Sequence, residues 1–363
     1  DAITLNEDSS VDVAASSGII QSNDSDQDGD SLTVHKFYLG ESTDSSPIEG
    51  ILGQAINGSY GLLTLNSDGS YQYSADNANA LGSGETAVDS FHYVVSDGKL
   101  TEKADISFTI EGVNDAPFLA DTTKKRKYIE GQSNVTVIDG SLDIIDPDNT
   151  DIESASIQFS SETYQATEDV LGFNDAYGIQ GGWNAATGVL SLTGSASISN
   201  YIKALESITY TNTNNANPVI GERTIEWTVN DGDANSTDVI SIVDVGGTND
   251  APESNNEAVA VDASSTISTT TQTNLLSNDT DPEGDSLSIL KFRLGTEKES
   301  STEFQAGNTI TGLYGRMTIQ ADGSYSYIAD QTGAKRLLTD ETRTETFTYT
   351  VSDSQDNDTG EIE

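Results

Sequence analysis

The feature that most constrains the fold is an internal repeat. The decapeptide Asn-Asp-Ser-Asp-Gln-Asp-Gly-Asp-Ser-Leu at residues 23–32 recurs as Asn-Asp-Thr-Asp-Pro-Glu-Gly-Asp-Ser-Leu at residues 278–287. Asp-Gly-Ser-Tyr at residues 68–71 recurs at 322–325, and Ser-Phe-His-Tyr-Val-Val-Ser-Asp at 90–97 recurs as Thr-Phe-Thr-Tyr-Thr-Val-Ser-Asp at 346–353. All three offsets lie between 254 and 256 residues. Near-equal offsets over a long stretch indicate one fold present twice.

A third unit of another subtype lies between the two copies. It is bracketed by the tetrapeptide Asn-Asp-Ala-Pro, found at residues 114–117 and again at 249–252. Asp97 precedes Asp115 by 18 residues and Asp231 precedes Asp250 by 19, so the units end alike. We therefore predict three domains, at residues 1–115, 116–250 and 251–363.

The segments within each unit have the pattern of short strands. Phe91, Tyr93 and Val95 alternate with other residues and would share one face of a strand. Gly, Asn, Asp and Ser separate such runs, which is typical of antiparallel all-β sandwiches. One segment differs, because residues 197–207 place apolar side chains at helical spacing, and there we expect a short helix.

The charge balance excludes several functions. The 363 residues include 16 Lys and Arg against 60 Asp and Glu, a net charge of −44, so we expect no binding to nucleic acid or to an anionic membrane surface. Intrinsic disorder is the alternative that such charge suggests, but the regular strand pattern opposes it. The chain has no cysteine and no long apolar run, so we expect neither disulfides nor membrane insertion. It begins without a signal peptide, as a fragment of a longer protein would.

Catalytic chemistry has little support in the sequence. The two histidines are His35 and His92, and we expect His92 to take a half-exposed position within a strand. No nucleophile elbow, phosphate-binding glycine loop or metalloprotease helix is found. We therefore expect no enzymatic activity.

The strongest chemical pattern is an acidic loop. Four alternating aspartates surround Gly29, and the second copy keeps most of them; they are Asp24, Asp26, Asp28 and Asp30, then Asp279, Asp281 and Asp285. Two carboxylates about 4 Å apart repel by about 4 kcal/mol at an effective dielectric of 20, so the loop should need a cation. Ca²⁺ is the expected ion, because it takes six to eight oxygen ligands. An EF-hand is excluded, since His35 and Leu290 stand where its glutamate would be, and a strand should follow the loop.

Strand direction predicts where further acidic groups meet. If strands alternate up and down, the acidic loop and the turns with Asp97, Asp231 and Asp353 lie at one end of each sandwich. Glu7, Glu130 and Glu257 come early in each unit and should face the other end, from which the Asn-Asp joints leave. Each joint would then be enclosed by two consecutive units.

These motifs together resemble cadherin repeats, in which an early glutamate, an Asx-rich linker and an Asp-x-Asp loop enclose calcium ions between domains. Units one and three are most similar to the bacterial cadherin-like and VCBS-type repeats of large RTX adhesins, through Asn-Asp-x-Asp-x-x-Gly-Asp, Asp-Gly-Ser-Tyr and Asn-Asp-Ala-Pro. The middle unit resembles another bacterial cadherin-like subtype, through residues 190–194, 204–210 and 227–232. The resemblance implies three tandem cadherin-like sandwiches in an extended rod.

The resemblance also implies two sets of calcium ligands. The first joint would use Glu7, Asn114, Asp115, Asp146 and Asp148, and the second Glu130, Asn249, Asp250, Asp279 and Asp281. The middle unit has Asp-Pro-Asp-Asn at residues 146–149 without the following Gly-Asp, so we expect weaker binding at the first joint.

The expected function is a calcium-stiffened stalk of a secreted bacterial surface adhesin, involved in cell adhesion or biofilm formation. Its partners would be neighbouring repeats of the same chain, and we expect a monomer. The alternative is a calcium-dependent lectin for extracellular polysaccharide, with Trp183 as a stacking platform, although a hydrophobic plug under a loop is the simpler interpretation of Trp183. The basic cluster at residues 124–127 is interpreted as a solvated strand face, or as a contact to an acidic neighbour or polysaccharide.

Overall fold

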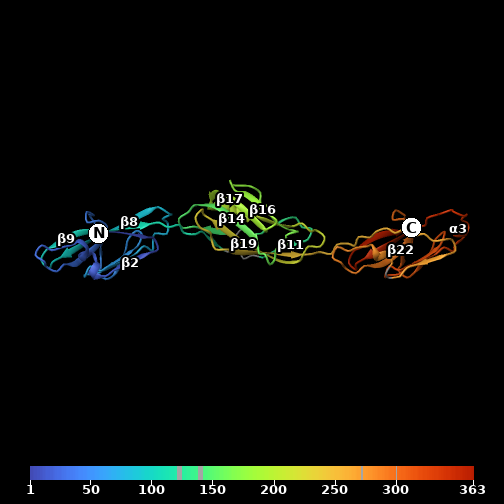
Figure 1. The fold of residues 1–363 in the computed structure, drawn as a ribbon, viewed down its shortest axis with the longest axis horizontal. Coiled ribbons are helices and arrows are strands. Elements are labelled where there is room, and N and C mark those ends of the chain that lie inside the picture. Colours follow the sequence, from blue (N-terminus) through green and yellow to red (C-terminus); the bar gives the residue numbers. More distant parts are fainter. Residues whose placement is uncertain (121–124, 138–141, 271–272, 300) are drawn as a thin grey trace.

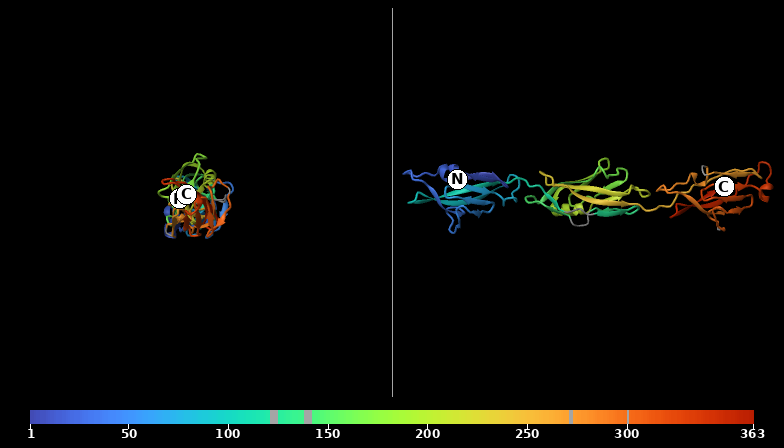
Figure 2. Two further views of the ribbon diagram at one scale, coloured as in Figure 1. Left: turned by 90° about the vertical axis from the view of Figure 1, so that its right-hand side faces the viewer. Right: turned by 90° about the horizontal axis from the view of Figure 1, so that it is seen from below.

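The computed structural model describes residues 1–120, 125–137, 142–270, 273–299 and 301–363. Three bodies of strands lie in line, joined by extended segments, so the molecule is a rod (Figure 1). Figure 2 shows the same arrangement from below, and in the view along the rod the three bodies overlap. The predicted all-β fold of three tandem sandwiches in an extended rod is confirmed.

The first body is a sandwich of two sheets. One sheet has the order β1 (Ala2–Asn6), β9 (Thr101–Glu111), β8 (Thr86–Ser96), β3 (Thr33–Leu39) and β4 (Ile48–Gly50). The other has the order β2 (Ser10–Val13), β7 (Tyr71–Ser74), β6 (Leu62–Leu65) and β5 (Ala55–Asn57). A short 3-10 turn at Ala15–Ser17 and helix α1 (Ile19–Asn23) lead into the acidic loop. The strand predicted after that loop is β3.

The middle body has a larger sheet and two smaller ones. The large sheet has the order β11 (Lys125–Ile129), β20 (Val239–Gly246), β19 (Gly221–Asn230), β14 (Asp151–Phe159), β17 (Val189–Ser197) and β16 (Gln180–Asn184). The smaller sheets are β12 (Val135–Thr136), β18 (Thr209–Asn212) and β15 (Asp169–Gly172), and the pair β10 (Phe118–Ala120) and β13 (Asp143–Ile145). The predicted helix is confirmed as α2 (Ile198–Glu206), which buries Tyr201, Ala204 and Leu205.

The third body repeats the first. Its sheets have the orders β23 (Phe304–Gln305), β22 (Ser288–Leu294), β27 (Phe347–Ser352), β28 (Asn357–Ile362), and β21 (Thr266–Ser268), β26 (Tyr325–Ile328), β25 (Arg316–Ile319), β24 (Thr309–Thr311). A 3-10 turn at Leu275–Ser277 and helix α3 (Thr332–Lys335) complete it. None of the described helices is long and apolar enough to cross a membrane.

Each body has its own hydrophobic core. In the first, Tyr73 and Phe108 stack with ring centroids 3.9 Å apart, and Phe91 meets both rings edge-on. In the second, Trp227 is 1% exposed and its indole nitrogen donates to Ser241 Oγ at 2.7 Å. Because each core is drawn from one body, each sandwich can be stable without contact to the next. The boundaries at residues 115 and 250 stay a prediction.

Within the described part of the chain two pairs of strands are parallel, and the other pairs are antiparallel. β1 pairs in parallel with β9, which places Asn6 opposite Glu111, and β11 pairs in parallel with β20, which places Ile129 opposite Gly246. Parallel partners end at the same edge of a sheet. The residue that follows β1 or β11 therefore lies beside the segment that leaves the unit after β9 or β20.

The expectation for His92 was wrong. Its side chain is 1% exposed, stacks on Tyr38 at 4.8 Å, and its Nδ1 lies 2.9 Å from Gly40 O. The segment after β3 covers this face, because Ser42 donates from its backbone and hydroxyl groups to Asp105 on the neighbouring strand. A face that alternation predicts to be solvated is thus covered by a loop.

Candidate metal centres at the two joints

A buried glutamate ties each linker to the unit that precedes it. Glu7 directly follows β1, and its Oε1 accepts a hydrogen bond of 2.5 Å from the backbone of Val113. Glu130 follows β11, and its Oε2 accepts one of 2.8 Å from the backbone of Thr248. Both glutamates are buried, with 6% and 7% exposure. The parallel pairing of β1 with β9 and of β11 with β20 produces both contacts.

The first linker is held on its other side by the middle unit. Asn114 Nδ2 donates to Asp231 Oδ2 at 3.0 Å, and the backbone of Asp115 donates to Asp148 Oδ2 at 3.4 Å. Asn149 Nδ2 donates to Asn114 Oδ1 at 2.9 Å. Asn149 thus contacts the linker at the point where the middle unit departs from the Gly-Asp pattern.

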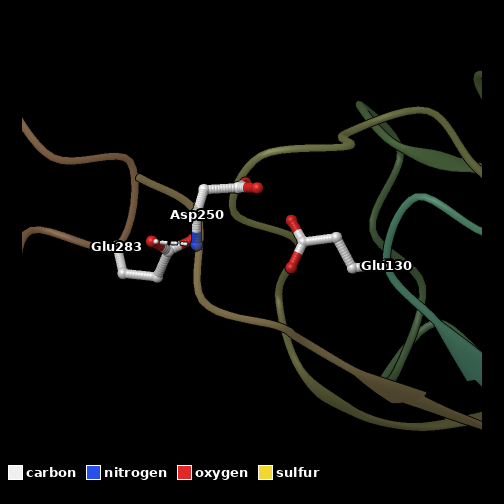
Figure 3. A group of neighbouring side chains, drawn as sticks. All are labelled: Glu130, Asp250 and Glu283. Carbon is white, nitrogen blue, oxygen red and sulfur yellow. Dashed lines mark hydrogen bonds between the residues drawn. The ribbon is translucent and has the colours of Figure 1, made fainter. Parts of the chain in front are cut away.

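The second linker repeats these contacts with the third unit. Asn249 Nδ2 donates to Asp353 Oδ2 at 2.8 Å and to Asp356 Oδ2 at 3.1 Å. The backbone of Asp250 donates to Glu283 Oε2 at 3.2 Å. Figure 3 shows Asp250 between Glu130 of the middle unit and Glu283 of the third. One carboxylate oxygen from each of the three lies within 4.8 Å of the others.

Buried carboxylate oxygens without a hydrogen-bond partner gather at both joints. At the first joint they are Glu7 Oε2, Asp115 Oδ2, Asp146 Oδ2 and Asp148 Oδ1, and at the second they are Glu130 Oε1, Asp281 Oδ2 and Glu283 Oε1. Burying a charged oxygen unpaired is costly, and in proteins such groups are paired or coordinate a metal. None of the ion pairs within the described part of the chain involves these seven residues.

The electrostatics of the first joint agree with an uncompensated negative charge. Burial, and a hydrogen bond with Asp146, raise the pKa of Asp148 to about 6. Burial also raises the pKa of Glu7 and the pKa of Asp115. Acidic neighbours, which include Asp8, raise both pKa values further. Asp231 differs, because hydrogen bonds from Ala234 and Asn114 outweigh its burial and lower its pKa. The donor set of hard oxygens with excess negative charge suits a divalent cation such as Ca²⁺.

The acidic loops share one turn in all three units. Asp26 Oδ1 accepts from the backbones of Asp28 and Asp30, at 2.8 and 2.9 Å, and Asp281 Oδ1 accepts from Glu283 and Asp285, at 3.1 and 2.9 Å. In the middle unit Asp146 Oδ1 accepts from Asp148 and Asn149. Asp26, Asp146 and Asp281 are therefore equivalent, and so are Asp28, Asp148 and Glu283.

The turns that contain Asp97, Asp231 and Asp353 are also alike. Each aspartate accepts backbone hydrogen bonds from the residues two and three positions later. In the first unit Lys99 pairs with Asp30 at 2.8 Å, and Asp24 accepts from Tyr93 at 3.0 Å. The predicted convergence of this turn with the acidic loop is thus seen within the first unit.

Two of the predicted ligands lie elsewhere. Asp279 was assigned to the second joint, but its Oδ1 accepts from the backbone of Asn255, and its acidic neighbours are Glu257 and Asp358. Glu257 was expected to match Glu7 and Glu130, but its backbone nitrogen donates to Glu361 O, as Asp1 donates to Asp105 O in the first unit. The acidic loop was aligned two residues too early, because Asp279-Thr-Asp281 and Asp281-Pro-Glu283 both have two acidic residues separated by one position.

Sequence reasoning missed Glu283 as a residue of the second joint. Alignment of the two acidic loops places Glu283 at the position of Asp28, so a search that accepted Glu for Asp would have found it. Asp8 and Asp356 were also missed, and no motif marks them.

Trp183 and the basic cluster are accounted for by local packing. Trp183 is half-buried and meets Phe159 and Tyr164 edge-on, with centroids 6.1 and 6.3 Å away, so the predicted hydrophobic plug is confirmed. Lys125 pairs with Glu222 and Asp244 on the surface of its own unit. Lys124 lies outside the described residues.

Comparison with known proteins identifies the family. A sequence profile described as bacterial cadherin-like domain matches residues 1–112 and 249–363, and halomucin from Haloquadratum walsbyi is 32% identical over 124 residues, which are 33% of this chain and 1% of halomucin. The chain thus spans a small fraction of that relative. Drosophila N-cadherin EC1–4 is a similar solved structure, with 12% identity and a TM-score of 0.30; the match covers 100% of this chain and 72% of that one. Mouse cadherin-23 EC22–24 is another, with 13% identity and a TM-score of 0.36; the match covers 92% of this chain and 85% of that one. Since the profile matches more than half of the sequence, the chain belongs to the bacterial cadherin-like domain family.

Proposed function

We propose that this chain is a calcium-stiffened stalk segment of an extracellular bacterial adhesin of the RTX type, which holds an adhesive tip away from the cell. The observation that carries the proposal is the set of seven buried, unpartnered carboxylate oxygens at the joints. At each joint these oxygens come from residues of both flanking sandwiches.

At each joint a calcium ion would supply the positive charge that these oxygens lack. At the first joint Glu7, Asp115, Asp146 and Asp148 would hold it, and at the second Glu130, Asp250, Asp281 and Glu283. Each set contains one residue before the linker, one in it and two after it. Bound this way, the two sandwiches and the linker become one cross-linked body.

Stiffening follows from the length and contacts of the linkers. Two extended linkers join bodies that have separate cores (Figure 1). One linker lies between β9 and β10, and the other lies between β20 and the third unit. Without the ion, each joint would carry mutually repelling carboxylates, which favour separation of the units. Adhesion and biofilm formation both need such reach from the cell surface. The role is structural and requires no catalytic group.

Small-angle scattering with and without calcium tests this function. Three sandwiches about 33 Å long, with loops, give a rod of about 100 to 130 Å and a radius of gyration near 35 Å, whereas a compact chain of this length would give about 21 Å. We expect the rod value with calcium and a smaller value with a chelator. Identical profiles in both conditions would show that calcium does not stiffen the joints.

A further inference from the structure

A second kind of acidic cluster surrounds Tyr349, inside the third unit. The Tyr349 hydroxyl lies 2.7 Å from Glu257 Oε2 and 2.9 Å from Asn255 O. Asp279 is 8% exposed, and its Oδ1 accepts from the backbone of Asn255 at 2.8 Å. The remaining oxygens, Glu257 Oε1 and Asp279 Oδ2, are buried without a hydrogen-bond partner. These two atoms need a positive partner for the same reason as those at the joints.

Among the described residues, no lysine or arginine pairs with this cluster. Asp358 lies close to Asp279 and accepts from the backbone and hydroxyl of Ser254. Within the described residues no ion pair involves Glu257, Asp279 or Asp358. Burial, with Asp279 nearby, raises the pKa of Glu257 to about 7, as expected for uncompensated negative charge.

The same constellation recurs in the first unit. The Tyr93 hydroxyl lies 3.0 Å from Asp24 Oδ2 and 3.3 Å from Asp1 Oδ2. A hydroxyl has one hydrogen, so it can satisfy one of these two oxygens at a time. Asp24 is equivalent to Asp279 in the repeat, and Asp1 is equivalent to Glu257 by its backbone pairing.

The middle unit provides an internal contrast. The residue two positions before Asp146 is Ile144, which is 4% exposed, and the residue four positions before Asp231 is Trp227. Apolar groups therefore take the places of Asp279 and Tyr349. The acidic pocket and the tyrosine are both present in units one and three, and both are replaced in the unit of the other subtype.

We propose that a divalent cation of the size of Ca²⁺ binds inside the third unit between Glu257 Oε1 and Asp279 Oδ2. A neutral oxygen borders the third-unit site, because Asn255 O accepts from the Tyr349 hydroxyl at 2.9 Å, and Asn255 Nδ2 in turn donates to Asn278 O at 2.8 Å. Such an ion would fasten the entering segment of the unit to the acidic loop and to β27. It is separate from the joint ions, and it does not depend on a second unit.

The test counts bound calcium on the whole chain by equilibrium dialysis. Glu257→Gln with Asp279→Asn should lower the count by one ion per chain, and Asp279→Ile, which copies the middle unit, should do the same. The matched control is Asp281→Asn with Glu283→Gln, which should remove an ion from the second joint instead. An unchanged count in the first variant, with the fold intact by circular dichroism, would overturn the proposal and leave a proton shared by the two carboxyls as the explanation.

Terbium luminescence supplies a readout that does not require removal of a ligand. Tyrosine transfers excitation to a nearby Tb³⁺ ion, and Tyr349 contacts the proposed ligand Glu257 directly. Tyr349→Phe should lower the sensitised emission while the calcium count stays the same, and the control at Asp281 and Glu283 should keep the Tyr349-dependent part. Emission that Tyr349→Phe leaves unaltered would also contradict the site. Because the joint control responds independently, failure of this site can be distinguished from failure of the joints.

Discussion

The Asn114 amide and the Asp231 carboxylate are joined by a hydrogen bond of 3.0 Å between residues 117 positions apart. It fastens the first linker to the β19–β20 turn of the sandwich that follows. Asn249 and Asp353 form the same bond at 2.8 Å at the second joint. With Glu7 and Glu130 holding the linkers from the other side, the direct hydrogen bonds fix the path of each linker. They leave the carboxylates between the units unsatisfied.

Calcium should stabilise the protein strongly against heat. A ligand at 100 times its dissociation constant adds about 2.7 kcal/mol per site to the free energy of unfolding, and several sites should add. The melting temperature, followed by circular dichroism, should therefore rise with calcium and fall with a chelator. Magnesium is the control, because it demands a tighter octahedral geometry and should stabilise less. If a chelator leaves the melting temperature unchanged, the joints bind no calcium.

Calcium binding at the first joint should weaken below about pH 6. The pKa of Asp148 is raised to about 6, above its ordinary value of 3.8, so the folded protein holds this proton more tightly than the unfolded chain. For the calcium-free protein, this group therefore lowers the free energy of unfolding as pH rises from about 4 to about 6. Calcium must displace the proton, so as pH falls below about 6 its apparent dissociation constant should rise up to about tenfold per pH unit for each proton displaced.

Calorimetric titrations at several pH values check this dependence. Asp148→Asn is the informative variant, because it removes the titrating group while it keeps an oxygen at the same place. It should bind calcium more weakly at neutral pH and show a flatter dependence on pH. A variant that retains the full pH dependence would assign the proton to another carboxyl.

The sequence predicted the architecture well because its repeats and strand alternation are local and strong. The helix at α2 and the contacts of Asn114, Asp231 and Glu130 follow from spacing and strand direction. Register within the acidic loop could not be predicted, since Asp279 and Asp281 offer equivalent chemistry and only three-dimensional pairing separates them. The burial of His92 also depends on a covering loop, which alternation along a strand does not reveal.

Trp183 should matter for stability and not for sugar binding. Its ring packs against Phe159 and Tyr164, so Trp183→Ala would remove a large part of the packing over this corner of the core. Because the side chain is half-buried, we expect a loss of about 2 to 4 kcal/mol, seen as a lower melting temperature of the middle unit. A glycan array with and without calcium is the companion measurement. Calcium-dependent glycan binding that Trp183→Ala abolishes in a folded protein would favour the lectin function instead.

The joints themselves are tested by paired variants. Asp146→Asn with Asp148→Asn removes two charges from the first joint, and Asp281→Asn with Glu283→Gln does so at the second. The new amides keep an oxygen for the backbone bonds that each loop makes to itself. The loops lie at the ends of the sandwiches, so all three cores should stay folded. Each variant should lose bound calcium, and scattering at fixed calcium should show a shorter mean length, because one joint now bends.

The matched control is Asp26→Asn with Asp28→Asn, which changes the same turn in the first unit, where it faces neither described joint. This variant should keep the parent's length at the same calcium concentration. The reasoning is that stiffness arises only where an ion is shared between two units. If the two joint variants lose calcium and yet remain as extended as the control, the ions stabilise loops without stiffening the rod. The stalk mechanism would then have to be replaced by one in which the direct bonds, such as Asn249 to Asp353, hold the units in line.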